Sequence, residues 1–568
     1  MVEATRDTLI GYITDVQSSN ISASLINDDQ GASPIITIGD EDLLIGQVGS
    51  YVLISQEQNK TLAMITRMSE QEKYLPSETG SRSADGLNDP LAIRTIFLIP
   101  LGRINGDGEF VRGIGIFPTT GAEVHAIGSE VIGSMFNRFQ SKGYNVGYLP
   151  TNESQEVYFD PTALFGRHFT ILGQTGAGKS YTVANLVQRA VSTMPKAHII
   201  LLDLHGEYSW LDQDSGERKY AFLDDSVRYV DARKLEIPYW LMTYAELCDL
   251  LIDHSEREAA NQTAFFRDNL LDLRLLEKET LALDRVSVDT PVYFSLEELL
   301  NRVKTENERM VDGANNRPKK GPMHGDFDRF LIRLESKLND VRYDFLLKPQ
   351  VRNSSSTLEE LLRDFVGLGE PKAPITIIDL SSVPFDVRPT VAAQIGRLAF
   401  EFNYWNPEYK EFPLLLLCEE AHAYIPRDSS MEFSGARKSM ERIAKEGRKY
   451  GVGLGVVSQR PHELSETVLA QCGSFICLRI TNPIDQNYVK NLVPEGERDL
   501  VDILSGLGRG ECMALGEAVP LPTRVQFYKA DPAPNSDDID FYQKWIEGPD
   551  DLNVADIVDK WRKQERSD

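Results

Sequence analysis

Residues 173–180 constrain the fold of this chain more than any other stretch. They read Gly-Gln-Thr-Gly-Ala-Gly-Lys-Ser and fit the pattern G-x-x-x-x-G-K-S/T without a mismatch. In this pattern the glycines turn backbone N–H groups toward the phosphates of a nucleotide, the lysine reaches the β- and γ-phosphates, and the serine hydroxyl ligates Mg²⁺. The predicted nucleotide-binding residues are Gly173, Gln174, Thr175, Gly176, Ala177, Gly178, Lys179, Ser180 and Tyr181, with Ser180 also a metal ligand.

The sequence on both sides of this loop agrees with a phosphate site. Residues 169–172 are an apolar run that predicts a buried strand, and residues 181–190 carry apolar side chains at helical spacing. A strand, a glycine loop and a helix N-terminus together form an anion site. Arg167, just before the strand, is either a phosphate-side or intersubunit arginine or an ordinary surface arginine.

Length and charge narrow the possible partners. The 568 residues are enough for several domains, and 86 acidic against 60 basic side chains give a net charge of -26. A monomer with this charge repels nucleic acid at long range, so a nucleic-acid contact requires a local basic surface, most easily one inside a ring. Five cysteines without a C-x-x-C pair predict buried thiols in a reducing compartment. No apolar stretch approaches membrane-spanning length, so we expect a cytoplasmic protein with no membrane partner.

The predicted fold class is α/β, with a RecA-like P-loop ATPase core, an N-terminal β-barrel and a helical insertion. In residues 1–127, short alternating runs separated by turn residues predict a small barrel. The runs are residues 8–14, 34–38, 51–55, 61–65, 95–101 and 113–117. We expect residues 68–92 to be a loop. No catalytic cluster is present here, which favours a packing or assembly role for the barrel.

The remaining chain predicts a divided ATPase core. Apolar runs in residues 128–242 and 371–530 alternate with helical segments and favour a mostly parallel sheet. Between them, residues 243–370 are charged and helical in pattern, with capping-box patterns beginning at Ser295 and Ser356. Inside this insertion, residues 315–321 form a basic loop that is either solvated or in contact with DNA. Residues 531–568 predict a C-terminal brace, with an acidic linker and an amphipathic helix near 551–566.

Acidic and polar residues after three predicted strands are candidates for the chemistry. Glu419 and Glu420 follow the apolar run 414–418. In P-loop ATPases with an additional strand, the first acid orders Mg²⁺ through its waters and the second polarises the attacking water. The first acid is usually Asp, and we expect the longer Glu419 to reach the metal. Asp203, at the end of the run 197–203, orders Mg²⁺ or a water or is an ordinary strand-end acid. Gln459 is either a γ-phosphate sensor or a polar strand-end residue.

A basic stripe lies between these segments. Lys438, Arg442, Lys445 and Lys449 fall on one face of a predicted helix. This face lines a pore, presents an arginine to the ATP of a neighbouring subunit, or is a solvated face paired with Glu441 and Glu446.

With these segments in view, the chain resembles the HerA family of the HerA/FtsK group of P-loop motor proteins. The resemblance rests on the glycine loop and on residues 203–208 (Asp-Leu-His-Gly-Glu-Tyr), 237–240, 419–426, 446–451 (Glu-Gly-Arg-Lys-Tyr-Gly) and 458–461, and it covers nearly the whole chain. The segments at 203–208 and 446–451 are much more specific than the loop itself.

The resemblance implies a homo-hexameric ring that hydrolyses ATP between subunits and pulls duplex DNA through its pore. By position, Arg448 is the first candidate for an arginine acting on the neighbouring subunit's γ-phosphate, with Arg442 and Arg167 behind it. Members of the family work with a nuclease or a sirtuin-like NAD-consuming effector, in DNA-end processing or antiphage defence. The alternative function is an ATPase assembly platform that activates such an effector with little translocation of its own. A secretion ATPase and a rotary synthase subunit are disfavoured.

Overall fold

The computed structural model describes residues 6–17, 20–26, 35–38, 41–44, 46–57, 59–73, 91–105, 110–212, 215–253, 255–312, 318–385, 387–427, 434–549 and 551–563. Its contacts divide the chain into two compact units. The first unit comprises Met1–Pro195, Gly455–Leu464 and Leu469–Ala533, and the second comprises Lys196–Leu454, Ser465–Val468 and Pro534–Asp568. The domain boundaries expected at residues 127, 242, 370 and 530 stay predictions.

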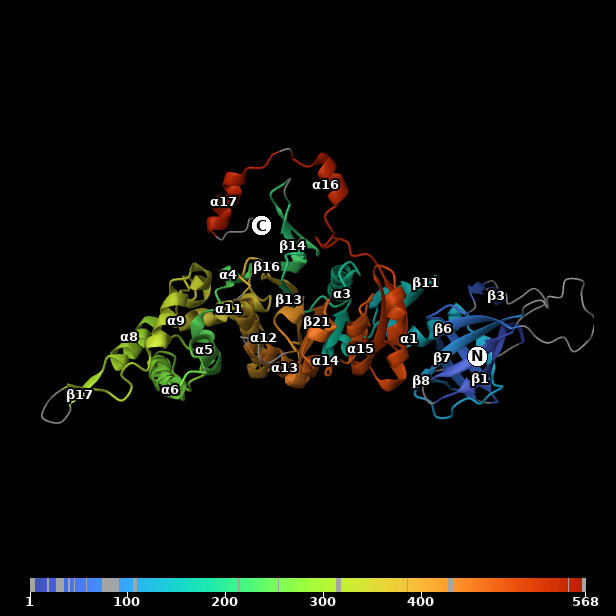
Figure 1. Cartoon of the computed structure of the whole chain (residues 1–568), viewed down its shortest axis with the longest axis horizontal. Coiled ribbons are helices and arrows are strands. Elements are labelled where there is room, and N and C mark those ends of the chain that lie inside the picture. Colours follow the sequence, from blue (N-terminus) through green and yellow to red (C-terminus); the bar gives the residue numbers. More distant parts are fainter. Residues whose placement is uncertain are drawn as a thin grey trace, which may run out of the picture. The chain divides into compact units, whose positions relative to one another are not determined.

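The first unit begins with a closed barrel, drawn in blue in Figure 1. Its strands follow the order β2-β1-β9-β5-β6-β7, and a pairing of β2 with β7 closes the ring. The strands are β1 (Leu9–Val16), β2 (Ile21–Leu25), β5 (Tyr51–Gln56), β6 (Asn59–Lys73), β7 (Leu91–Ile104) and β9 (Glu123–Ala126). Closure leaves no unpaired edge in the ring, which is how a small β-domain avoids edge-to-edge association. The predicted N-terminal barrel is confirmed.

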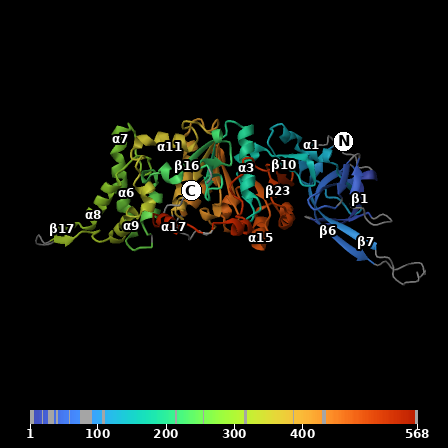
Figure 2. The same cartoon turned by 90° about the horizontal axis from the view of Figure 1, so that it is seen from above.

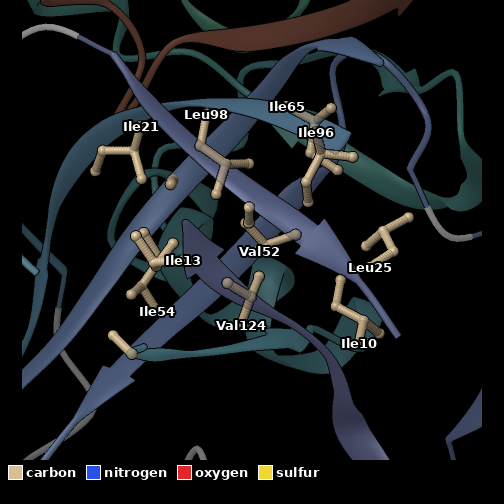
Figure 3. Packing of buried hydrophobic residues seen from close by; sticks show 13 residues of the cluster. Ile10, Ile13, Ile21, Leu25, Val52, Ile54, Ile65, Ile96, Leu98 and Val124 are labelled. Carbon is tan, nitrogen blue, oxygen red and sulfur yellow. The ribbon is translucent and has the colours of Figure 1, made fainter. Parts of the chain in front are cut away.

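Alternate side chains of these strands fill the barrel interior (Figure 3). Ile21, Ile96, Leu98 and Val124 are fully buried there. Since successive side chains of a strand point to opposite faces, alternate positions of β2, β5, β6 and β7 contribute to this apolar core. In β1 the core residues Ile10 and Ile13 are three positions apart, because the pairing register of this strand shifts.

The strand predictions in this region are partly wrong. Residues 113–117 form no strand, because Gly113 takes a φ of 95° directly after the short β8 (Phe110–Arg112). The expected loop at 68–92 is also wrong at both ends, since β6 and β7 pair through to Lys73 and Leu91. Residues 74–90 lie outside the described part. The sequence analysis missed β2, β9 and β4 (Glu41–Leu44), which pairs with β3 (Ile35–Ile38). In β2 and β9, small or polar residues separate the few apolar ones.

The sheet of the first unit is only partly parallel. Its order is β11-β10-β24-β23-β22-β12-β21, and β12 pairs in parallel with β22 and with residues 455–458 of β21. The other neighbours are antiparallel. The strands are β10 (Asn145–Leu149), β11 (Asn152–Tyr158), β12 (Phe169–Leu172), β21 (Val452–Ser458), β22 (Ser474–Cys477), β23 (Glu511–Gly516) and β24 (Thr523–Phe527). The prediction of a mostly parallel sheet therefore fails at this end, where short connections join β10 to β11 and β23 to β24.

Specific hydrogen bonds fasten the barrel to strands β23 and β24 of the same unit. The guanidinium of Arg112 donates to the carbonyls of Gly516, Val519 and Pro520. Arg524 pairs with Glu511 and donates to the carbonyl of Val48. The buried hydroxyl of Tyr51 donates to the Pro522 carbonyl over 2.8 Å. These contacts hold the barrel against the sheet.

The second unit contains a fully parallel sheet of order β20-β13-β19-β16. Its strands are β13 (Ile199–Asp203), β16 (Val227–Asp231), β19 (Ile375–Asp379) and β20 (Leu414–Cys418). Every residue of β13, β19 and β20 is buried, as expected for strands covered on both faces. The helices α12 (Arg388–Trp405) and α13 (Ser434–Glu446) belong to this unit.

Residues 244–365 contribute most of the remaining helices of the second unit (Figure 2). They are α5 (Tyr244–Leu251), α6 (Ala259–Leu275), α7 (Glu277–Thr280), α8 (Leu296–Asn307), α9 (Asp328–Leu338), α10 (Asp344–Leu347) and α11 (Leu358–Phe365). Of the capping box predicted at Ser295, one half is present: the Ser295 hydroxyl accepts the N–H of Glu298 at the start of α8, while the Glu298 carboxylate accepts a hydrogen bond from Arg302. The cap predicted at Ser356 is wrong, because α11 begins at Leu358 without a side-chain cap. Thr243 and Glu246 form a complete capping box at α5, which was not predicted.

Three further expectations concern loops, termini and cysteines. Part of the basic loop at 315–321 is strand, because β18 (Pro318–Lys320) pairs with β17 (Met310–Asp312), and residues 313–317 lie outside the described part. The C-terminal segment forms α16 (Phe541–Glu547) and α17 (Val554–Lys563). All five cysteines are buried free thiols, as predicted. Among the helices of the described ranges, none is long and apolar enough to cross a membrane.

We predict that Ile21→Ala destabilises the barrel by about 2–5 kcal/mol, because it leaves a cavity in a closed apolar core. Ile26→Ala is the matched control, since Ile26 lies just beyond β2 and is 43% exposed whereas Ile21 is 0% exposed. Urea unfolding followed by circular dichroism measures the difference. Equal effects of the two substitutions would contradict the described packing of the barrel.

Candidate nucleotide-binding site

The glycine loop of the first unit follows the carboxyl end of β12 and leads into α3 (Lys179–Thr193), as predicted. Gly176 and Gly178 have φ angles of 74° and 101°, a region that side chains with a Cβ rarely adopt. A Cβ on Gly178 would lie 2.9 Å from the backbone nitrogen of Gly510. The loop therefore requires glycine at position 178 both for its backbone conformation and for a close contact.

Segments distant in sequence hold this loop in place. The N–H of Gly510 donates to the Ala177 carbonyl over 2.9 Å. The N–H of Gln174 donates to the Arg479 carbonyl, and its side-chain oxygen accepts the Thr481 hydroxyl over 2.6 Å. Sequence reasoning missed these anchors, because no motif links positions about three hundred residues apart.

The side chains expected to touch the phosphates lie at the start of α3. Lys179 and Ser180 are half-buried, and the Lys179 ammonium is 3.5 Å from the Gln174 carbonyl, at the outer limit of a hydrogen bond. The guanidinium of Arg509 lies 5.5 Å from the ring centroid of Tyr181, a basic side chain that the sequence analysis missed. Lys179 and Arg509 bring positive charge to the N-terminus of a helix, where anions are favoured.

Gln459 and the glycine loop are in direct contact. Gln459 follows the last residue of β21, and its side-chain oxygen accepts the Thr175 hydroxyl over 2.6 Å. The predicted sensor and the predicted phosphate loop are thus joined inside the first unit by one hydrogen bond.

Arg167 lies at the amino end of β12, whereas the glycine loop follows the carboxyl end. Its guanidinium pairs with Glu517. This position does not favour a contact with phosphate bound at the loop of the same chain. A role of Arg167 toward a neighbouring subunit stays a prediction.

In the second unit, Asp203 fixes the turn that follows β13. Its carboxylate is fully buried and accepts the N–H groups of His205, Gly206, Glu207 and Tyr208 over 2.8–3.3 Å. Burial raises the pKa of Asp203 to about 7, and the hydrogen bonds from the turn act in the opposite direction. These contacts give Asp203 a structural part in shaping residues 204–208, which its position in the sequence did not reveal.

Glu419 is held at the end of β20, the strand next to β13. Its side chain is only 4% exposed, and one carboxylate oxygen accepts the hydroxyl of Tyr208 over 3.0 Å. Burial raises the pKa of Glu419 well above its usual range, and the neighbouring carboxylates of Asp203 and Glu207 add to the shift. Within the described residues the second carboxylate oxygen of Glu419 is buried without a hydrogen-bond partner. An unsatisfied buried carboxylate oxygen fits a hydrated Mg²⁺, the ligand predicted for this residue.

Glu420 has a strained backbone. Its φ and ψ are 43° and 44°, a left-handed conformation that costs a residue other than glycine of order 1–3 kcal/mol. The side chain is 8% exposed, and its carboxylate lies 3.2 Å from Nδ1 of His422. Such strain is concentrated at functional sites, where the surrounding structure holds a side chain in one direction.

The candidate arginines differ in their surroundings. Arg442 lies 4.2 Å over the ring of Phe400 and 3.9 Å from the carboxylate of Glu401. Arg448, in the turn after α13, is exposed and makes no ion pair within the described part of the chain. A role of Arg448 toward a neighbouring subunit stays a prediction.

Much of the basic stripe is paired with acids. Lys438 lies 3.9 Å from Asp249, and Lys445 lies 3.6 Å from Glu441. Lys449 lies beyond the end of α13, so the four basic residues do not share one helix face. The interpretation as a solvated, paired face thus describes the stripe better than a continuous basic surface.

Comparisons with known proteins agree with the motifs. The family described as "Helicase HerA, central domain" matches residues 144–399. The resemblance to the HerA family is confirmed. The chain is 29% identical over 460 residues to a "DNA double-strand break repair helicase HerA" of Pyrococcus furiosus, covering 76% of each chain. It is 26% identical to the HerA protein of Sulfolobus acidocaldarius, covering 92% of this chain and 98% of that one.

The glycine loop and the similarity to the HerA proteins together show that the chain is an ATP-hydrolysing enzyme, as predicted. Among solved structures, VirB4 of Thermoanaerobacter pseudethanolicus is similar over 68% of this chain and 95% of that one, at 17% identity and a TM-score of 0.44.

We predict that Gly178→Ala weakens ATP binding about tenfold or more, because the left-handed conformation alone costs an L residue about 1–2 kcal/mol and the new Cβ displaces Gly510. Gly166→Ala, at the end of α2 (Pro161–Gly166), is the matched control, since an added Cβ there meets no atom within 4 Å. Calorimetric titration with ATP measures both. Unchanged affinity in Gly178→Ala would contradict the assignment of the loop.

Proposed function

We propose that the chain is an ATP-driven DNA translocase that works as a homo-hexameric ring with a partner nuclease or effector. The observation that carries this proposal is the glycine loop, with Gly176 and Gly178 in left-handed conformations between a buried parallel strand and the N-terminus of α3. The HerA proteins to which the chain is similar are named as helicases of DNA double-strand break repair, which supports duplex DNA as the substrate.

In this proposal the loop and the acids have separate roles in the hydrolysis of ATP. Backbone N–H groups of the loop and Lys179 bind the phosphates, and Ser180 and Glu419 hold Mg²⁺, directly or through its waters. When bound, Mg²⁺ neutralises charge on the phosphates. Glu420 accepts a proton from the attacking water. Gln459 acts as a sensor that contacts the γ-phosphate.

Arg448 completes the site from the neighbouring subunit in this proposal. Its exposure and the lack of an ion pair within the described residues support this role over Arg442, whose guanidinium is occupied by Phe400 and Glu401. An arginine supplied in this way stabilises the negative charge of the transition state. Ring assembly is then a condition for hydrolysis.

One observation favours the alternative function, an assembly platform for a nuclease or sirtuin-like effector. Lys438 and Lys445 of α13 are close to acids, so this helix offers little free positive charge to DNA. The overall charge of -26 points in the same direction. Stimulation of ATP turnover by DNA distinguishes the two functions.

We predict that Glu420→Gln binds ATP but hydrolyses it about 10²–10⁴-fold more slowly, because the amide cannot accept a proton. The exposed Glu411 provides the matched control, Glu411→Gln. Phosphate release is measured with and without long duplex DNA. Strong stimulation of the unmodified protein supports a motor, and turnover indifferent to DNA supports the platform. Normal turnover in Glu420→Gln would remove its proposed role.

We predict that Arg448→Ala lowers turnover by about 10³–10⁵-fold in assembled rings while ATP binding stays intact. Mixing with Lys179→Ala subunits restores part of the activity, because about one quarter of the interfaces in an equal mixture combine an intact loop with an intact arginine. Lys449→Ala, at the neighbouring exposed position, is the control. If mixing restores nothing, Arg448 does not act across the interface.

A further inference from the structure

The contacts of Glu419 differ from those expected of a strand-end acid facing only a nucleotide. Its carboxylate accepts the hydroxyl of Tyr208 over 3.0 Å, and its main-chain carbonyl accepts the hydroxyl of Tyr424 over 2.7 Å. Both tyrosines are buried, so neither hydroxyl has water as an easy alternative partner. One tyrosine therefore fixes the direction of the side chain, and the other fixes the backbone that carries it.

Tyr208 is itself rigidly placed. Its N–H donates to the carboxylate of Asp203 over 2.9 Å, so it belongs to the turn that Asp203 holds with four backbone hydrogen bonds. Its ring stacks on Phe222 with centroids 6.1 Å apart. Asp203 ends β13, and β13 pairs directly with β20, the strand that ends just before Glu419. The turn that follows β13 thus places the Tyr208 hydroxyl beside the Glu419 carboxylate at the end of the neighbouring strand β20.

We propose that Tyr208 is a positioning residue that orients the Glu419 carboxylate toward Mg²⁺. This inference rests on the proposed function, in which Glu419 orders the metal of a bound nucleotide. The hydroxyl occupies one carboxylate oxygen and leaves the other, which is buried without a hydrogen-bond partner among the described residues, for the hydration shell of the cation. Residues that hold a metal ligand by its second oxygen set the geometry and the affinity of metal sites.

The length of the Glu419 side chain explains why such a group is needed. Glutamate has one more rotatable bond than the aspartate usual at this position, and fixing rotatable bonds of a side chain costs free energy at the moment of metal binding. If the hydrogen bond to Tyr208 forms during folding, the Glu419 side chain is already fixed when the metal binds, and metal binding no longer includes this entropic cost. Asp203, fully buried and holding the turn, is then part of the same support and not a second metal ligand.

The first test compares two Tyr→Phe substitutions in the full chain. Tyr208→Phe removes only the hydroxyl that Glu419 accepts. Tyr229→Phe is the matched control, because the Tyr229 hydroxyl donates to the carboxylate of Asp379 over 2.9 Å at the end of another strand of the same sheet. Binding of Mn²⁺ is followed by electron paramagnetic resonance in the presence of the non-hydrolysable analogue AMPPNP, and thermal unfolding is recorded for each variant.

We expect Tyr208→Phe to weaken Mn²⁺ binding about 10–100-fold, with Tyr229→Phe within about twofold of the unmodified protein. Affinity for AMPPNP without metal should be unchanged in both. Equal metal affinity of Tyr208→Phe and the unmodified protein, while Glu419→Gln is impaired, would overturn this inference and leave the proposed function standing. Equal metal affinity of Glu419→Gln and the unmodified protein would instead overturn the metal role of Glu419 in the proposed function.

A second test separates positioning from a general loss of structure. We expect the shorter carboxylate of Glu419→Asp to lose its contact with the Tyr208 hydroxyl, so that adding Tyr208→Phe weakens Mn²⁺ binding no further. A double-mutant cycle measures this coupling. Additive losses, together with a matching fall in the unfolding temperature, would show that Tyr208 acts on the fold and not on the direction of Glu419.

Discussion

The burial of two carboxylates at adjacent strand ends is the constraint on which the second unit depends. Asp203 and Glu419 have almost no contact with water, and burying a charge is costly unless hydrogen bonds compensate. The chain supplies these bonds unequally. Asp203 receives four backbone N–H groups, whereas Glu419 receives one hydroxyl and keeps an oxygen without a partner in the described part. One acid is satisfied by folding, and the other is left ready for a ligand.

The first unit is subject to a different constraint, because its phosphate loop must bind anions with backbone N–H groups. Backbone N–H groups face a ligand only if the loop is prevented from turning them elsewhere. Gly510, Arg479 and Thr481 supply that restraint from segments that follow β22 or precede β23. The conformation of the loop therefore depends on contacts from the C-terminal half of the chain as well as on its own glycines.

Local patterns in the sequence predicted the parts of the site that local chemistry determines. The spacing of residues 173–180 identified the phosphate loop, and the mostly apolar runs 169–172 and 414–418 located β12 and β20. The contact between Gln459 and Thr175 was not predicted, because it depends on the parallel register of β12 and β21. The structural part played by Asp203 was also missed, since four hydrogen bonds to a following turn leave no signature beyond the acid itself. The barrel strands β2 and β9 were not predicted, because few of their residues are large and apolar.

The attachment of the barrel has a mechanical consequence. Gly510 donates to the phosphate loop at Ala177, and the next residue, Glu511, pairs with Arg524, which donates to Val48 beside the barrel strand β5. Two successive residues thus connect the nucleotide loop on one side and the barrel on the other. The segment that restrains the phosphate loop is therefore also the segment to which the barrel is attached, so a displacement of the barrel would act on the residue next to the one that holds the loop.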